Sequence, residues 1–447
     1  MPLTGAVAFS REILGQVRQA RVRRHGFLPN FIVVMTGTGV AQAFTVCFAP
    51  VLSRLYGPGE LGQYGSFLSV AAVLSAGLTL QYSEALMLPE RDEEAANLFA
   101  AATGSAIVLT AVFTLWAAFF PAGWLALVRV PALAGWLWLI PLAALFGALN
   151  QILIAWCARR KTLRPAAAAQ VARSATANSV QAAAGAVGWG TSGLIGGALL
   201  GDILANLGLF FHVVRHDIAL LRAGAQGKPM LAAAREYKDF ALYSTPQNVM
   251  SAVSEGAPVI LLIHYFGIAT GGLYAFAVRV LQVPMNFILS SLRQVLFQKL
   301  SEVYNEGGDL RGLFRKTTTL LLGLSLAPAA IGLVLAPWVF AVVFGRQWAT
   351  AGEYARWLLI WLVPGFCNLP AGLVGRILRQ QRNLFLFDLF FLVARIGVLV
   401  LGGCYLTPGQ TVVAFSIVGG VFNVALILFI WWLLSARDGL RRAACLQ

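Results

Sequence analysis

The chain has 447 residues, of which 59% are hydrophobic and only 11% are charged, and its mean hydropathy is +0.76. Soluble domains carry about 25% charged residues, so this composition excludes a water-soluble globular protein. The formal net charge of +15 would suit nucleic acid, but the basic residues are scattered over the length of the chain, and we predict no nucleic-acid partner.

Apolar stretches follow one another along the chain, and each is long enough to cross a bilayer. A membrane-spanning helix needs about 20 predominantly apolar residues, and no strand-like alternation recurs. We therefore predict an all-α polytopic membrane protein with about twelve transmembrane helices. In chain order, the predicted spans are 31–52, 64–88, 98–119, 133–157, 165–187, 191–213, 240–266, 271–296, 317–344, 353–379, 384–404 and 411–434.

The basic residues between these spans are distributed unevenly. The segments on the same side as the N-terminus hold 25 Lys and Arg residues, whereas the opposite side holds three, Arg54, Arg129 and Arg346. Because cytoplasmic loops carry an excess of Lys and Arg, we predict a multi-pass protein of the bacterial inner (cytoplasmic) membrane with both ends inside. Residues 1–26 and 437–447 are then two cytoplasmic tails.

A short glycine motif occurs twice. Gly57-x4-Gly62-x-Tyr64 joins the first two predicted spans, and Gly267-x4-Gly272-x-Tyr274 joins the seventh and eighth. We therefore predict two parallel six-helix lobes, residues 27–225 and 226–436, which surround a central cavity and are related by an axis along the membrane normal. The alternative is that a glycine turn recurs by chance.

Ionisable residues inside the spans are the candidate functional residues, because a charge at the bilayer centre costs about 2.5–3.5 kcal/mol. Arg173 and Asp202 fall at similar depths in neighbouring spans, as do Glu255 and Arg279. Each hairpin is therefore predicted to hold an ion pair. Two interpretations stay open: the pairs only lock their hairpins, or Asp202 and Glu255 bind a proton or sodium ion during transport.

The sequence offers little support for an enzyme. The five cysteines have no metal-ligand or redox-motif spacing,, and the short predicted outer loops hold only two carboxylates, Glu60 and Glu353. We predict no catalytic residues, no metal and no cofactor.

Five segments carry a resemblance to a known family. They are Ala49–Tyr64 (APVLSRLYGPGELGQY), Gln81–Asn97, Lys238–Pro246 (KDFALYSTP), Gly272–Pro284 (GLYAFAVRVLQVP) and Val343–Gly352. In this order they resemble Wzx-type polysaccharide transporters, the lipid-linked oligosaccharide and O-antigen flippases of the MOP exporter superfamily. Beyond residue 365 only the hydropathy is similar.

The resemblance implies a flippase with a central cationic cavity. Such a protein moves an undecaprenyl-pyrophosphate-linked oligosaccharide repeat unit from the inner to the outer leaflet by alternating access, for surface polysaccharide biosynthesis. Its expected partners are that glycan lipid, membrane lipids and a polysaccharide polymerase. The alternative is a cation-coupled multidrug or lipid II exporter of the same superfamily.

Arginines are the expected ligands of the pyrophosphate, because guanidinium groups bind phosphate oxygens bidentately and stay charged at cellular pH. Arg279 ranks first, since it lies mid-span in a segment that carries the resemblance, and Arg54, Arg173 and Arg395 follow. Arg54 has a second interpretation as an anchor at the membrane interface. For Glu84, near the inner end of the second span, we favour structural ion pairing over gating.

Overall fold

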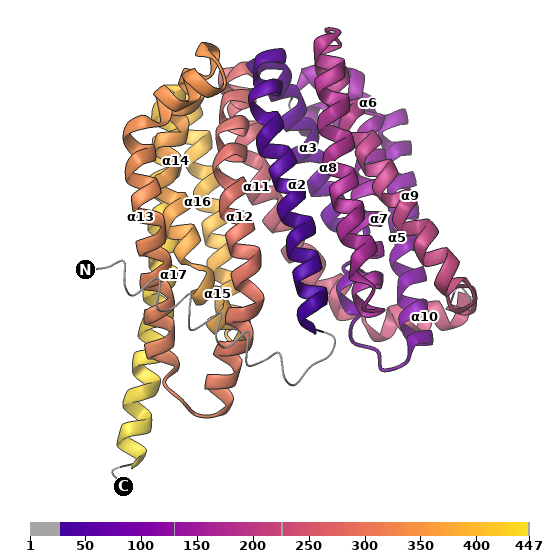
Figure 1. Ribbon diagram of the computed structural model, residues 1–447, viewed down its shortest axis with the longest axis vertical. Coiled ribbons are helices and arrows are strands. Elements are labelled where there is room, and N and C mark those ends of the chain that lie inside the picture. Colours follow the sequence, from indigo (N-terminus) through magenta and orange to yellow (C-terminus); the bar gives the residue numbers. More distant parts are fainter. Residues whose placement is uncertain (1–26, 129, 225–226, 446–447) are drawn as a thin grey trace.

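The computed structural model describes residues 27–128, 130–224 and 227–445, and all regular structure within them is helical (Figure 1). The predicted tail 1–26 lies outside the described residues. The long helices are α2 (Phe27–Leu55), α3 (Pro58–Leu78), α5 (Asp92–Phe119), α7 (Leu139–Arg159), α8 (Leu163–Ala186), α9 (Gly190–Gly224), α11 (Thr245–Phe266), α12 (Ile268–Asn305), α13 (Leu310–Val343), α14 (Ala349–Cys367), α16 (Gln381–Tyr405) and α17 (Pro408–Cys445).

Shorter helices connect these long ones. They are α4 (Tyr82–Ala85), α6 (Pro121–Val128), η2 (Pro131–Trp136), α10 (Gly227–Glu236), the π-helical turn η3 (Phe240–Ser244), η4 (Arg346–Trp348) and α15 (Leu369–Ile377). Within the described residues, ten helical segments are long and apolar enough to cross a membrane. The protein is thus a multi-pass helical membrane protein, as predicted. The helices α2 and α8 are not among the ten, so the count of twelve crossings and the inside position of both ends stay predictions.

Local backbone chemistry shifts the predicted second span at both of its ends. The helix α3 starts at Pro58, six residues earlier than predicted, because Glu60 Oε2 accepts a hydrogen bond of 2.8 Å from the Gly57 amide and caps the helix. It ends at Leu78 instead of residue 88, since Leu80 and Gln81 have positive φ angles of 47° and 55°. Such a backbone conformation cannot continue a right-handed helix.

The tenth predicted span, 353–379, is two helices, α14 and α15, and the join between them lies at Asn368. Pro370 in the first turn of α15 lacks the amide hydrogen that a continuous helix would need,. The Asn368 side chain donates a 3.0 Å hydrogen bond to Asn423 Oδ1 on α17, which fixes the join. At the other end of the chain, α17 remains helical to Cys445, so the predicted tail 437–447 begins inside a helix.

Figure 1 shows two groups of helices side by side, α2 to α9 in one and α11 to α17 in the other. We call them the first and second halves. They meet where α3 packs against α11 and α12. The connecting helix α10 packs against α5 of the first half, and the predicted lobe boundaries, 27–225 and 226–436, stay a prediction.

The two glycine motifs contact each other at one end of this interface. A Cβ atom on Gly62 would overlap the carbonyl oxygen of Ile268, and a Cβ atom on Gly272 would overlap that of Pro58. Ile268 and Pro58 are separated by the same 210 positions as the two glycines. A contact in which equivalent residues meet reciprocally lies on a two-fold axis. The two glycine motifs are therefore related by a local two-fold axis where α3 packs against α12.

Candidate functional site

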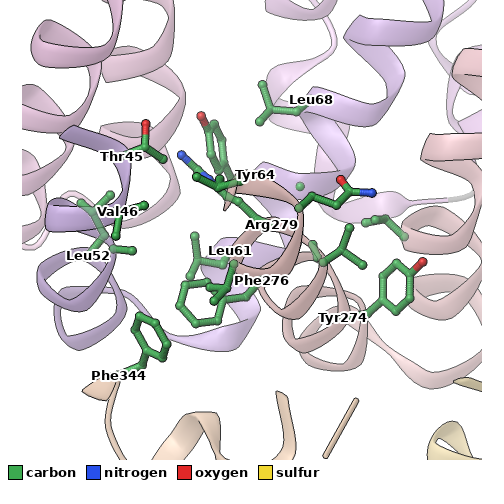
Figure 2. Close-up of a pocket in the computed structure, with 18 of the residues that line it drawn as sticks. Thr45, Val46, Leu52, Leu61, Tyr64, Leu68, Tyr274, Phe276, Arg279 and Phe344 are labelled. Carbon is green, nitrogen blue, oxygen red and sulfur yellow. The ribbon is translucent and has the colours of Figure 1, made fainter. Parts of the chain in front are cut away.

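A pocket of about 500 Å³ lies between the two halves. We call it the central pocket. Its walls come from α2, α3, α11 and α12, together with Leu194 of α9 and the end of α13, and they are mostly apolar. Figure 2 shows Arg279 in this pocket together with Thr45 and Val46 of α2 and Tyr64 and Leu68 of α3. Two of the described lining residues carry a charge: Glu255 is acidic and Arg279 is basic.

Arg279 lies on α12, which contributes nine of the residues that line the pocket, between Tyr274 and Pro284. The predicted ion pair between Glu255 and Arg279 does not occur among the described residues, although both side chains line this pocket. Glu255 also lines a second pocket. Arg279 thus has no carboxylate partner among the described residues.

One end of the central pocket is closed by hydrogen bonds that link α2 to the second half. The Ser53 carbonyl oxygen accepts from Gln347 Nε2 at 2.8 Å and from Trp348 Nε1 at 2.7 Å, and Ser53 Oγ donates to the Phe344 carbonyl at 3.1 Å. Ser53 and Trp348 are fully buried. We call these four residues the Ser53 cluster. The charge distribution predicts that this end faces outward.

Arg54 belongs to this closed end. Its Nη2 atom lies 3.4 Å from the Val343 carbonyl oxygen, its side chain is exposed, and it is not among the residues that line the pocket. In this conformation Arg54 is a contact between the halves and does not face the space around Arg279.

A second pocket of about 370 Å³ lies within the second half, among α11, α12, α14, α16 and α17. Its charged lining residues are Glu255, Asp388 and Arg395. Four residues of α11 and α12 line both pockets and thus form the wall between them: Glu255, Tyr274, Val278 and Gln282.

Arg395 is a buried cation held by aromatic rings. Its side chain is 6% exposed. The guanidinium carbon lies 4.5 Å from the centre of the Phe415 ring and 5.1 Å from those of Trp361 and Phe391. Its Nη1 atom donates to Ser254 Oγ at 3.0 Å. Cation–π contacts of this kind stabilise a desolvated guanidinium, and Arg395 makes no ion pair within the described part of the chain.

The remaining predicted residues lie elsewhere. Arg173 on α8 forms an ion pair with Asp202 on α9, and neither lines the two pockets. The two helices can approach closely here because Gly201 has no Cβ atom. A Cβ atom at this position would lie only 2.7 Å from the Arg173 carbonyl oxygen. Glu84 is exposed on the short helix α4, outside both pockets.

Sequence reasoning did not include Asp388, Trp361 or Asn423 in the site. A signal for Asp388 exists, since it precedes Arg395 by seven residues, two helical turns, and so shares a face of α16 with it,. Trp361 and Asn423 carry no such signal, because helices distant in the chain bring them to the pocket. No group of three or more His, Cys, Asp or Glu side chains that could hold a metal occurs in the described part of the chain.

The described helices have the same fold as solved transporters of the MOP superfamily. A structure described as the inward-facing conformation of a multidrug resistance MATE family transporter aligns with a TM-score of 0.72 at 17% identity, covering 91% of this chain and 96% of that one. The lipid II flippase MurJ in an inward closed conformation aligns with a TM-score of 0.71 at 14% identity, covering 92% and 90%. At these identities the likeness concerns the fold.

The sequence identifies the family. A family model described as "Polysaccharide biosynthesis protein" matches residues 51–353, more than half of the chain, and the chain belongs to this family. The succinoglycan biosynthesis transport protein ExoT of Rhizobium meliloti is 22% identical over 351 residues. That match covers 77% of this chain but only 65% of the relative's length. The predicted resemblance to Wzx-type transporters is confirmed.

Proposed function

We propose that this protein moves an undecaprenyl-pyrophosphate-linked oligosaccharide from the inner to the outer leaflet of the bacterial inner membrane, for surface polysaccharide biosynthesis. The family match and the ExoT relative support a role in exporting polysaccharide or its precursors. The observation that carries the proposal is Arg279, a cation without a carboxylate partner among the described residues, in an otherwise mostly apolar pocket between two halves.

The chemistry of the central pocket suits a pyrophosphate with a lipid attached. A guanidinium group binds phosphate oxygens through two parallel hydrogen bonds, and an apolar surrounding strengthens that attraction because water does not screen it. Apolar side chains of α2 and α12 line the same space. Those surfaces would accept the part of the prenyl chain nearest to the phosphates.

Alternating access requires the closed end of the pocket to open. The links that would separate are the Ser53 cluster and the reciprocal contact of Gly62 with Gly272. Both join the first half to the second, so a movement of one half against the other releases them together. Such rocking of two repeats about a fixed site is a general solution for transporters.

Two sources of free energy remain open. An anionic head group that moves outward travels down an inside-negative potential, worth about 2.3 kcal/mol per charge per 100 mV. Coupling to a proton or sodium ion is the other source. Of the two predicted carboxylates, Glu255 is better placed for coupling, because it lines both pockets whereas Asp202 lines neither and is paired with Arg173.

The test is deletion of the gene in its host, complemented with wild-type protein or Arg279→Ala. The readouts are surface polysaccharide, lipid-linked intermediates in the inner leaflet and the level of protein in the membrane. Arg279→Ala should abolish surface polysaccharide and trap completed repeat units inside at a normal protein level. Arg293→Ala is the matched control, since Arg293 lies on the same helix and lines neither pocket.

Wild-type surface polysaccharide in Arg279→Ala would refute the site assignment. Unchanged polysaccharide in the deletion strain, together with raised sensitivity to cationic drugs, would instead favour a multidrug exporter. Loss of cell-wall synthesis with intact surface polysaccharide would favour a lipid II exporter.

A further inference from the structure

We infer that the second pocket binds an uncharged, hydroxyl-rich glycosyl residue of the transported head group, while Arg279 holds the pyrophosphate. This inference rests on the proposed function, and it assigns separate parts of one substrate to separate pockets. The two pockets share the wall of Glu255, Tyr274, Val278 and Gln282. A head group that is anchored at Arg279 is therefore adjacent to the second pocket.

Two buried donors of the second pocket lack acceptors. Arg395 Nε and Trp361 Nε1 have no hydrogen-bond partner in the described part of the chain. They lie near each other, since the guanidinium carbon of Arg395 is 5.1 Å from the centre of the Trp361 ring. A buried donor left unpaired costs about 1–3 kcal/mol. A ligand that brings acceptor oxygens to this corner of the pocket would remove that cost.

The same pocket also presents acceptors. The carboxylates of Glu255 and Asp388 line it, and neither is in an ion pair within the described residues. The amides of Gln282 and Asn286 are further lining groups. A ligand of this pocket must therefore both donate and accept hydrogen bonds.

This combination selects among ligand classes. A hydroxyl group is one donor and two acceptors, so a sugar ring can donate to the carboxylates and accept from Arg395 and Trp361. A pyrophosphate is a strong acceptor only, and two carboxylates against one guanidinium would repel it. An organic cation could pair with the carboxylates but would leave both buried donors unpaired and would face Arg395. We therefore assign Arg395 to the sugar and not to the pyrophosphate.

The size of the pocket agrees with part of a head group. Ligand pockets range over about 300–1,000 Å³, and the second pocket, at about 370 Å³, lies at the lower end of that range. It suits a small number of sugar rings at one end of the repeat unit. The glycosyl residue nearest to the pyrophosphate would be the one bound, because the pocket adjoins the Arg279 site.

Trp361→Phe tests the assignment. This substitution keeps an aromatic ring next to Arg395 and removes a donor that has no partner in the described structure, together with part of the volume of the indole. A purely structural role predicts that binding of both probes changes alike. Asp388→Asn is the second variant, and Trp432→Phe is the matched control, because Trp432 is exposed on α17 and lines neither pocket.

Affinities would be measured in lipid nanodiscs for two probes. One is undecaprenyl pyrophosphate without sugar, and the other is the undecaprenyl-pyrophosphate-linked oligosaccharide extracted from the deletion strain. We expect Trp361→Phe to weaken binding of the oligosaccharide lipid by about fivefold, the value of one hydrogen bond. We expect it to leave the affinity for the bare carrier unchanged. Arg279→Ala should weaken binding of both.

Every other pattern overturns the inference. The second pocket does not bind the sugar if wild-type protein binds both probes with equal affinity. The same holds if Trp361→Phe and Asp388→Asn leave the difference in affinity between the probes unchanged. In both cases the flippase proposal still stands. If these variants weaken both probes alike, their role is structural. If wild-type protein binds neither probe, the proposed function itself has failed.

Discussion

The contact between Gly62 and Gly272 allows a sharp test of how the closed end of the pocket is held. In Gly272→Ala the new Cβ atom would overlap the Pro58 carbonyl oxygen and would lie 2.7 Å from the Gly62 amide nitrogen. Real Cβ atoms do not come so close to backbone, and backbone atoms cannot rotate away. The helices α3 and α12 must therefore move apart.

Overpacking of this kind costs about 1–3 kcal/mol. In the proposed movement the two glycines separate when this end opens, so the cost falls on the closed arrangement. A shift of 1.4 kcal/mol changes an equilibrium tenfold, so Gly272→Ala should raise the population of the open end by roughly 5–150-fold.

A single cysteine reports that opening. Leu61 is 7% exposed, lines the central pocket and lies next to Gly62 on α3. Leu61→Cys in a cysteine-free background should react with a soluble maleimide in nanodiscs at a rate that follows the open population, and Gly272→Ala should accelerate the reaction within the range above.

The matched control is Gly59→Ala on α3, the helix that Gly272 contacts. A Cβ atom on Gly59 meets no atom within 4 Å, so this substitution brings the same gain in helix propensity without a clash,. Equal labelling rates in Gly272→Ala, Gly59→Ala and the parent protein would refute the reasoning that the glycine contact holds this end closed.

Three further substitutions test other contacts. Arg173→Ala leaves the buried Asp202 carboxylate without its partner, so it should lower stability by about 1–3 kcal/mol, and adding Asp202→Ala should restore part of the loss in a thermal unfolding assay. Trp348→Phe removes the 2.7 Å hydrogen bond to the Ser53 carbonyl oxygen and part of a fully buried ring, so it should lower stability by at least about 1 kcal/mol. Arg159→Lys should speed proteolysis of the turn between α4 and α5, because an ammonium group cannot reproduce the guanidinium contacts that hold this turn,.

Each of these predictions has a control and a result that would contradict it. A double variant as unstable as Arg173→Ala alone would show that the unpaired carboxylate is not the cause. Trp338 is 63% exposed, so Trp338→Phe should leave stability unchanged. If Trp338→Phe lowered stability as much as Trp348→Phe, the buried contacts of Trp348 would not be the cause. Unchanged proteolysis in Arg159→Lys would show that the turn is held by other groups.

Hydropathy predicted the helices well because a helix that spans the bilayer needs about 20 predominantly apolar residues, whatever its tertiary contacts. It failed where local groups decide the backbone. Four of the residues from 80 to 88 are Leu or Met and extend the apolar run of the predicted span, yet Leu80 and Gln81 adopt positive φ angles and end α3. The join at Asn368 depends on an amide contact with Asn423, and no pattern within either helix predicts a partner 55 residues away.

The candidate site was predicted in part for a similar reason. Arg279 could be found because it lies within a helix and within a segment that carries the family resemblance. The pairing of Arg173 with Asp202 could be predicted because both fall at similar depths in neighbouring spans, given the rise of 1.5 Å per residue of an α-helix,. Arg54 was grouped with Arg279 because it lies in a segment that carries the resemblance, and Arg395 because it lies deep within a predicted span. Only the packing of distant helices shows that they lie at a closed end and in a different pocket.

The two pockets differ in what a relative movement of the halves does to them. The central pocket takes its walls from both halves, so its shape depends on their separation, and a ligand there interacts differently with each conformation. The second pocket is built from the second half alone and keeps its shape if that half moves as a unit. A ligand with equal affinity for two states shifts nothing between them. In such a protein the contacts of the second pocket would set which substrate is retained, and the contacts of the central pocket would set the direction in which the equilibrium moves.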